Sequence, residues 1–436
     1  MNLLPVVETK IQVSVERVHR GHAQDEGHDD VATTPSQDAV LSRITHLRGP
    51  PPAVGMLRDC YYRELYNQPL DFQRLSRRSP EMRAEMDRCG QYLDLQNPTN
   101  LILLTKALLD QHFGGLQLEL PPDRLCPPVP NRHLYILWLK DLLDSTGPLV
   151  EERCLETTER ELVGMDIGTG ASAIYPILGC TERPWKFIAT ELDESSFNYA
   201  QENLARNNLL DRVRLVRRPK PYHEDSAPLV PLDELSVDRV DFTMTNPPFY
   251  ESQVDMLKRY ADKKIPPISV NTGGSNELIC KDGEVGFVRQ IIEESTRLRN
   301  RVQWYTSMLS SPQSVEKLLA ELKGRCITNT AATTFNTGGA TRRYGLAWSF
   351  DNKRPSRGAA RGKNDAIAKK IPRGLLSAET EVLLPLGSQK TPEELALKVE
   401  KYVAALNLHH WTWDHAKRKG SGFTAEAVWT RSYRRK

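Results

Sequence analysis

The segment Thr245–Phe249 has the clearest chemical potential in the sequence, because an asparagine is followed by two prolines and an aromatic ring. The side-chain oxygen of Asn246 and the main-chain carbonyl of Pro247 are two acceptors for the N–H bonds of a planar amine such as adenine N6. Held in this way, the amine turns its lone pair out of the ring and becomes nucleophilic. Pro247 and Pro248 lock the loop, so the acceptors need no reorganisation, and Phe249 offers a face for a flipped base. The alternative interpretation is a rigid proline turn.

A second candidate site, Met165–Gly170, places an acid and two glycines between an expected strand and an expected helix. Gly168 and Gly170 let the main chain approach a ligand closely, above the N-terminus of the helix. The third glycine of the dinucleotide fingerprint and the lysine of a phosphate-binding loop are both missing, so the pattern does not predict phosphate binding. We take Asp166, Gly168, Thr169 and Gly170 as candidate cofactor contacts, and a purely structural glycine turn stays open as the alternative.

An acid follows at the end of the next expected strand, where the sequence reads Ala189-Thr-Glu191-Leu-Asp193. An acid about twenty residues beyond a glycine turn is placed to accept hydrogen bonds from both hydroxyls of a ribose. Either Glu191 or Asp193 fits this role, and the other is then a solvated or capping acid. Turn and acid together favour a cofactor that carries a nucleoside. A methyl group moving in line from a sulfonium to an amine needs no metal and no covalent intermediate, and proximity supplies much of the rate.

Strands that alternate with helices are expected to position these residues. The expected strands are residues 162–166, 186–192, 213–217, 240–245, 302–309, 326–335 and 344–350, and the expected helices between them are 171–178, 194–208, 282–299 and 314–322. This alternation predicts an α/β fold with an open, doubly wound sheet and helices on both faces. The turn Asn336–Gly339 predicts that the last two strands form an antiparallel hairpin.

Composition divides the rest of the chain. The predicted segments are a disordered extension (1–55), a helical module (56–150), the main α/β domain (151–352), a basic linker (353–373) and a small α+β module (374–436). In the helical module we expect helices over 100–109 and 132–144, the second capped by Asn131, and a strand over 116–120. In the last module we expect a helix over 392–406 and strands over 379–386, 410–415 and 425–432.

The charge distribution and the cysteine content limit the kinds of protein that this chain can be. The formal net charge is only +3, but residues 353–373 hold eight Lys or Arg against one acid, Asp365. A basic cluster of this kind neutralises phosphates or forms a solvated linker, and charge alone does not decide between the two. The seven cysteines are scattered and never form CxxC, which excludes a disulfide framework and a structural zinc site and favours a reducing compartment. No run is apolar enough to predict a membrane span or a signal peptide.

With these motifs in this order, the sequence resembles class I methyltransferases of the Asn-Pro-Pro-Phe/Tyr type. More narrowly, it resembles the methyltransferase-like protein 16 family and its bacterial relatives that modify adenine in large-subunit ribosomal RNA. The resemblance covers residues 56–350. It rests on Leu70–Phe72, Asn97-Pro98, Val129–Arg132 through Trp138, Met165–Gly179, Thr190-Glu191, Asn198–Ala200, Asn246–Phe249, Ser269–Gly274 and Leu346–Phe350.

The resemblance implies a Rossmann-like, seven-stranded sheet with an added N-terminal helical module that grips RNA. It implies S-adenosylmethionine as the methyl donor, held by Arg132, Gly168, Glu191 and Asn246, and it implies that Asn246 is also the catalytic asparagine. By the same resemblance, the RNA contacts are Lys263, Lys264 and Arg343, with Arg342 replacing a basic residue that aligns with Ala340.

We therefore expect an RNA adenine-N6 methyltransferase that acts on U6 small nuclear RNA in the nucleus, with a cytoplasmic presence left open. Two alternatives stay open. The first is a protein-glutamine N5 methyltransferase, because a glutamine amide is likewise planar and delocalised. The second is a non-catalytic RNA-binding factor with a vestigial methyltransferase fold.

Overall fold

The computed structural model describes residues 9–14, 56–146, 161–219, 227–261, 272–338, 342–376, 391–416, 418–424 and 428. The chain divides into two compact units. The larger unit comprises residues 47–351 and 355–380, and the smaller one residues 1–46, 352–354 and 381–436. Within the described ranges, no helix combines the length and the apolar character needed to cross a membrane.

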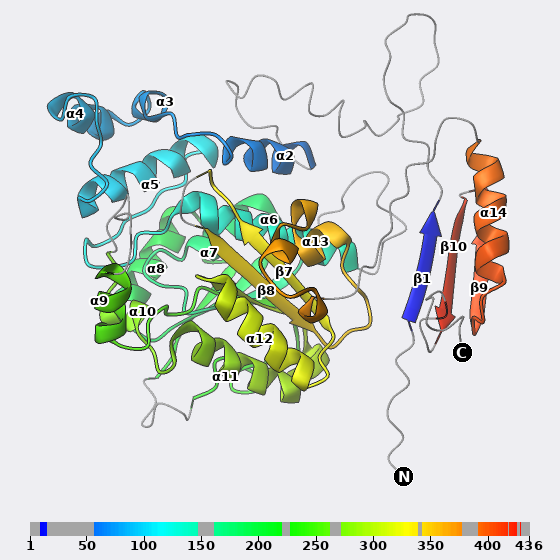
Figure 1. Ribbon diagram of the computed structural model, residues 1–436. Coiled ribbons are helices and arrows are strands. Elements are labelled where there is room, and N and C mark those ends of the chain that lie inside the picture. The colour runs from blue at the N-terminus through cyan, green and yellow to red at the C-terminus, as the bar shows by residue number, and fades with distance from the viewer. Residues whose placement is uncertain are drawn as a thin grey trace, which may run out of the picture. The chain divides into compact units, whose positions relative to one another are not determined.

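The larger unit is built on a seven-stranded sheet in the order β4-β3-β2-β5-β6-β8-β7 (Figure 1). Its strands are β2 (Val163–Ile167), β3 (Lys186–Glu191), β4 (Val213–Arg217), β5 (Val240–Thr245), β6 (Val302–Leu309), β7 (Asn329–Phe335) and β8 (Arg343–Ser349). The first five are parallel, and β8 runs antiparallel to both β6 and β7. The predicted doubly wound sheet with a closing hairpin is confirmed. The strand order reverses between β2 and β5, which is where open α/β sheets bind their ligands.

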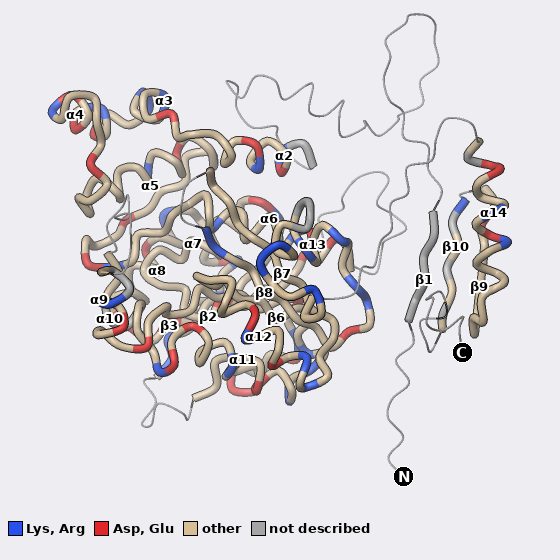
Figure 2. The backbone as a smooth tube through the Cα atoms, viewed as in Figure 1, with Lys and Arg blue, Asp and Glu red and all other residues tan. Residues whose placement is uncertain are grey.

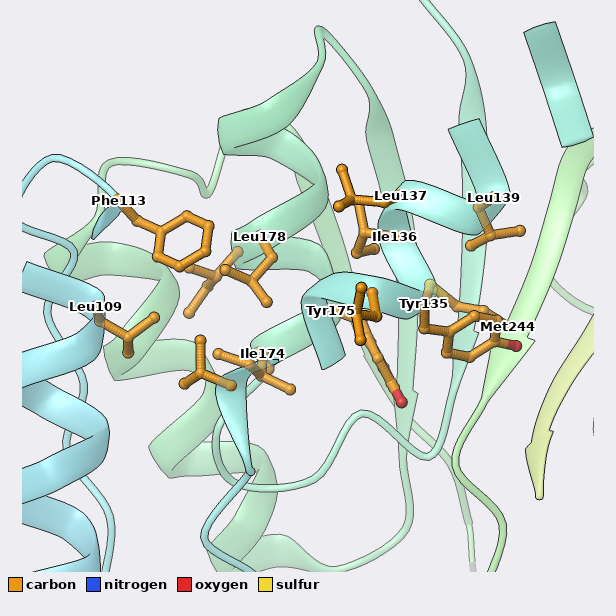
Figure 3. Close-up of a cluster of buried hydrophobic side chains, with 14 of the residues drawn as sticks. Leu109, Phe113, Tyr135, Ile136, Leu137, Leu139, Ile174, Tyr175, Leu178 and Met244 are labelled. Atoms are coloured by element: carbon orange, nitrogen blue, oxygen red, sulfur yellow. The ribbon is translucent and has the colours of Figure 1, made fainter. Parts of the chain in front are cut away.

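Helices cover both faces of this sheet. One face packs against α6 (Val129–Thr146), α7 (Ile174–Glu182) and α8 (Glu194–Arg206), and the other against α11 (Gly283–Leu298) and α12 (Pro312–Gly324). Figure 3 shows the first of these cores, in which Leu178 of α7 lies near Phe113, and Tyr135 of α6 lies beside Tyr175 and Met244. The Tyr135 hydroxyl also lies 2.6 Å from the Thr306 hydroxyl of β6, which fixes α6 to the centre of the sheet.

The residues of the predicted helical module form α2 (Met56–Leu65), α3 (Phe72–Ser76), α4 (Pro80–Arg88), α5 (Pro98–His112) and α6, which belong to the larger unit. Two local predictions are wrong. Residues 116–120 are not a strand, because their main chain bonds to side chains of α8: the Glu119 N–H donates to Asn203 Oδ1 at 2.8 Å and the Gln117 N–H to Asn207 Oδ1 at 2.9 Å. Asn131 is not a helix cap, because α6 begins at Val129 and Asn131 lies in its first turn.

The predicted basic linker is folded, and from Pro355 onward it belongs to the larger unit. It forms α13 (Arg357–Arg361) and two 3₁₀ helices, Lys363–Lys369 and Arg373–Leu375, and Figure 2 shows its Lys and Arg residues around α13. Ala359, Ala360, Ile367 and Ile371 are buried between the charges, and the indole N–H of Trp138 donates to the Ala359 carbonyl at 2.7 Å. Apolar residues spaced among basic ones therefore give this segment a buried face, which its net charge conceals.

The smaller unit contains a three-stranded antiparallel sheet in the order β1-β10-β9. Its elements are β1 (Thr9–Ser14), α14 (Pro392–Ala404), β9 (His410–Asp414) and β10 (Lys419–Thr424). One prediction needs correction, because Thr9–Ser14 lies in the expected disordered extension yet pairs with β10. A six-residue strand is too short for its periodicity to stand out without its partner. The strand expected over 379–386 lies outside the described residues, and so, apart from Val428, does the strand expected over 425–432.

Two further helices, α9 (Gln253–Ala261) and α10 (Ser275–Leu278), follow β5.

Candidate active site

The carboxyl ends of β2, β3 and β5 bring the two predicted motifs together. Ile167 at the end of β2 is in register with Thr190 of β3 and Thr245 of β5. The Thr245 hydroxyl donates to the Ile167 carbonyl at 2.8 Å, and the Thr169 N–H donates to the Thr190 carbonyl at 2.9 Å. The loop after β5 and the glycine turn after β2 are therefore fixed to each other by main-chain geometry.

Two positions of the turn after β2 require glycine because of their backbone conformation. Gly168 has φ +71° and Gly170 has φ +67°, in the left-handed region where a side chain causes strain. The Gly170 N–H donates to Glu191 Oε2 at 2.8 Å, so the turn and the end of β3 form one structure.

Glu191 and Asp193, both open candidates from the sequence, have different surroundings. Glu191 accepts three main-chain N–H bonds, from Gly170, Leu192 and Asp193. Burial raises the pKa of Glu191, and these three hydrogen bonds oppose that effect. Asp193 instead caps α8, accepting from the Ser196 N–H at 2.9 Å. Glu191 is thus the acid at the turn, and Asp193 is the capping acid.

Asp166 is fully buried in β2, and neither carboxyl oxygen has a hydrogen-bond partner in the described part of the chain. Burial raises its pKa to about 7, the charge of Glu191 adds to this rise, and the charge of Arg132 opposes it. A buried carboxyl without partners is costly when ionised. A positive charge bound beside it would favour the ionised form.

Arg132 of α6 is the positive charge enclosed nearby. Its side chain is 5% exposed, and its Nη1 donates to the Tyr175 hydroxyl at 2.8 Å. The guanidinium carbon lies 5.4 Å from the centre of the Tyr175 ring. Burial raises the pKa of Tyr175 to about 12, and the charge of Arg132 counteracts that rise. Arg132 is therefore held in one position by α7.

The loop after β5 carries the amide oxygen of Asn246. Asn246 is partly buried, and within the described ranges its Oδ1 is enclosed without a hydrogen-bond donor. Pro247 is buried and Pro248 partly buried. Just beyond, the Tyr250 N–H donates to the Leu278 carbonyl at 2.9 Å, which anchors the loop to α10. The amide oxygen of Asn246 thus lies on an anchored loop and can accept a hydrogen bond.

Phe249 is covered by a cation. The guanidinium carbon of Arg343 lies 5.2 Å from the centre of the Phe249 ring, a cation–π contact, and its Nη1 donates to the Arg342 carbonyl at 3.1 Å. Burial and the charge of Arg132 lower the pKa of Arg343. Arg342 is exposed. Lys263 and Lys264, the other expected RNA contacts, lie outside the described residues.

One residue at the glycine turn was not found from the sequence. Glu277 of α10 places its Oε1 3.7 Å from the position that a Cβ on Gly170 would occupy. Glu277 lies in a short helix far along the chain from the turn, so no fixed spacing in the sequence links it to the glycines. Across the described ranges, no group of three His, Cys, Asp or Glu side chains is arranged to hold a metal ion.

This sheet order, with a glycine turn after the central strand and Asn-Pro-Pro-Phe after its neighbour, defines a class I methyltransferase fold. The chain belongs to a family of RNA methyltransferases whose family model matches residues 57–352.

Two curated relatives illustrate the similarity. The chain is 37% identical over 324 residues to the RNA N(6)-adenosine-methyltransferase METTL16 of Gallus gallus, covering 73% of this chain and 56% of that protein. It is 36% identical over 284 residues to the U6 small nuclear RNA (adenine-(43)-N(6))-methyltransferase of Schizosaccharomyces pombe, covering 65% and 69%. The chain therefore matches little more than half the length of the first of these relatives and about two thirds of the second.

Solved structures agree with this assignment. The hMettl16 catalytic domain in complex with MAT2A 3′UTR hairpin 1 is 36% identical with a TM-score of 0.56, covering 65% of this chain and 92% of that one. The N-terminal domain of human METTL16 in complex with SAH is 32% identical with a TM-score of 0.50, covering 70% and 100%.

Proposed function

We propose that the chain is an RNA adenine-N6 methyltransferase, which transfers a methyl group from S-adenosylmethionine to an adenosine of U6 small nuclear RNA in the nucleus. The observation that carries the proposal is the amide oxygen of Asn246, which has no hydrogen-bond donor among the described residues. It lies on a proline-locked loop in register with the glycine turn. The family membership supports the reaction class. The fission yeast relative, which is named for U6, supports the substrate and the nuclear location.

On this proposal, the glycine turn and the residues around it hold the donor. Glu191 accepts the ribose hydroxyls, Arg132 faces the donor carboxylate, and Gly168, Thr169 and Gly170 let the main chain approach. The donor supplies a methyl group on a positively charged sulfur, which suits a site where the buried Asp166 has no hydrogen-bond partner in the described chain. A related domain has been solved with SAH, which supports the same cofactor class here.

The acceptor adenine is held by the loop after β5. Asn246 Oδ1 and the Pro247 carbonyl accept the two N–H bonds of N6, and Pro248 stiffens the loop. Phe249 stacks against the base. Lys263, Lys264, Arg342 and Arg343 bind the RNA backbone around it.

The rest of the chain contributes RNA affinity. The helices from α2 to α6 grip the RNA, and the small unit that contains β1 and β10 adds binding rather than catalysis. The related catalytic domain in complex with a hairpin supports RNA binding by the larger unit.

The test is transfer of a labelled methyl group from S-adenosylmethionine to total small RNA, followed by nucleoside analysis. We expect labelled N6-methyladenosine in the U6 fraction, and none with Asn246→Ala. Label in protein alone would favour glutamine methylation instead. No label in any fraction would leave a non-catalytic RNA-binding factor.

A further inference from the structure

Glu277 has two carboxyl oxygens with different surroundings. Its Oε2 accepts the Leu125 N–H at 2.9 Å and the Gly274 N–H at 3.0 Å. This oxygen joins the segment before α6 to the segment before α10. A structural role for Glu277 is therefore fully accounted for by Oε2.

The other oxygen, Oε1, has no hydrogen-bond donor within the described residues, and it lies beside Gly170. Among the charges that act on Glu277, Arg124 lowers its pKa and Glu191 raises it. Arg124 is itself bound to Asp123 and Asp193. Burial raises the pKa of Glu277, and the two main-chain hydrogen bonds oppose this rise.

Gly170 is therefore flanked by two carboxylates. Glu191 binds its N–H, and Glu277 lies on the side that a Cβ would occupy. Two carboxylates that face the same space favour a ligand that brings positive charge between them.

A methionine-derived donor brings four polar groups: a carboxylate, an α-ammonium, a sulfonium and a ribose diol. Arg132 suits the carboxylate and Glu191 suits the diol. The α-ammonium still needs an acceptor. Asp166 is less suited than Glu277, because both of its oxygens are enclosed, whereas Glu277 is only partly buried.

We propose that Glu277 Oε1 accepts a hydrogen bond from the α-ammonium group of the methyl donor, while Oε2 keeps the surrounding loops in place. The inference rests on the proposed function, since it requires that S-adenosylmethionine binds at the glycine turn. It adds a donor-binding residue that lies beyond both sequence motifs.

Glu277→Gln separates the two roles. The glutamine carbonyl oxygen can keep both main-chain hydrogen bonds, while the amide nitrogen replaces Oε1 and the charge is lost. The experiment is calorimetric titration of the full chain with S-adenosylmethionine, S-adenosylhomocysteine and 5′-methylthioadenosine. The last compound keeps the nucleoside but lacks the amino-acid end. Glu293→Gln, at an exposed position on α11, is the matched control.

For Glu277→Gln we expect about ten- to a hundredfold weaker binding of the first two ligands, as for loss of a charged hydrogen bond. Binding of 5′-methylthioadenosine and the melting temperature of the free chain should not change. Unchanged S-adenosylmethionine affinity would overturn the inference, and so would an equal loss for 5′-methylthioadenosine. If the unaltered chain bound none of the three ligands, the proposed function itself would fail.

Discussion

The two halves of the candidate active site differ in how far their polar groups are already satisfied. On the donor side, Glu191 accepts three main-chain N–H bonds and ties the glycine turn to β3. On the acceptor side, Asn246 Oδ1 has no donor among the described residues, and Phe249 is covered by Arg343. At the glycine turn the donor side is therefore held together by its own hydrogen bonds, although Asp166 and Glu277 Oε1 lack partners among the described residues. The acceptor side has no such internal hydrogen bond at Asn246 Oδ1.

This difference has an energetic reason. Enclosed polar atoms without partners are destabilising, so a protein keeps them where a ligand will satisfy them. A base that enters above Phe249 must also exchange places with, or stack beside, the Arg343 guanidinium. The following predictions test this contrast, starting with the largest effect.

Asn246→Ala is expected to remove turnover while sparing the donor side. Without the amide oxygen, the N6 lone pair is no longer directed at the methyl group, and we expect a loss of about a hundredfold or more in kcat. Single-turnover methylation of U6 RNA measures this step. Donor affinity, measured by calorimetry, should fall far less than turnover, because the glycine turn and Glu191 still hold the donor. A parallel loss of donor binding would show that the two halves are not separable.

Glu191→Ala should have the opposite pattern. It removes the ribose acceptor and three main-chain hydrogen bonds of the turn, so we expect donor affinity to fall by about a hundredfold. Asp193→Asn is the matched control, because Asp193 caps α8 and should affect stability by about 1 kcal/mol or less. If the control weakened donor binding as much as Glu191→Ala, the two acids would have been assigned the wrong way round.

Arg343→Ala is expected to change RNA binding and leave donor binding intact. Loss of one phosphate contact should lower RNA affinity and reduce the slope of log affinity against log salt by about one. Arg342→Ala, at the exposed neighbouring position, should have a smaller effect. Filter binding across a salt series measures both variants. Tighter RNA binding by Arg343→Ala would mean that Arg343 blocks the base site rather than gripping RNA.

The sequence predicted the donor side better than its surroundings. Short motifs at strand ends predicted that Gly168, Glu191 and Asn246 meet at one edge of the sheet, and the structure brings them there, because parallel strands bring their carboxyl ends to one edge. Their roles in binding and catalysis stay predictions. Glu277 was missed, because its position depends on how the chain after β5 returns to the turn. The folded basic segment and β1 were missed for a related reason: each gains its structure from a partner distant in sequence.

The stability of the free chain should depend on pH through the buried Asp166. Its pKa is about 7, raised from 3.8 mainly by burial, so the folded chain favours the protonated form. The corresponding contribution to stability is complete below pH 3.8 and is lost as the pH rises to about 7. Asp166→Asn should remove this dependence, so the stability of the unaltered chain should fall relative to the variant across that window. Urea unfolding midpoints at several pH values provide the comparison.

Saturating S-adenosylmethionine should reduce this pH effect in the unaltered chain, because a bound cation favours the ionised form of Asp166. Burial also raises the pKa of Glu191, so part of the pH slope should persist in Asp166→Asn. Equal slopes for the two chains without donor would show that Asp166 is already satisfied in the free protein. The donor side would then be complete before any ligand binds, and the contrast with the acceptor side would be sharper.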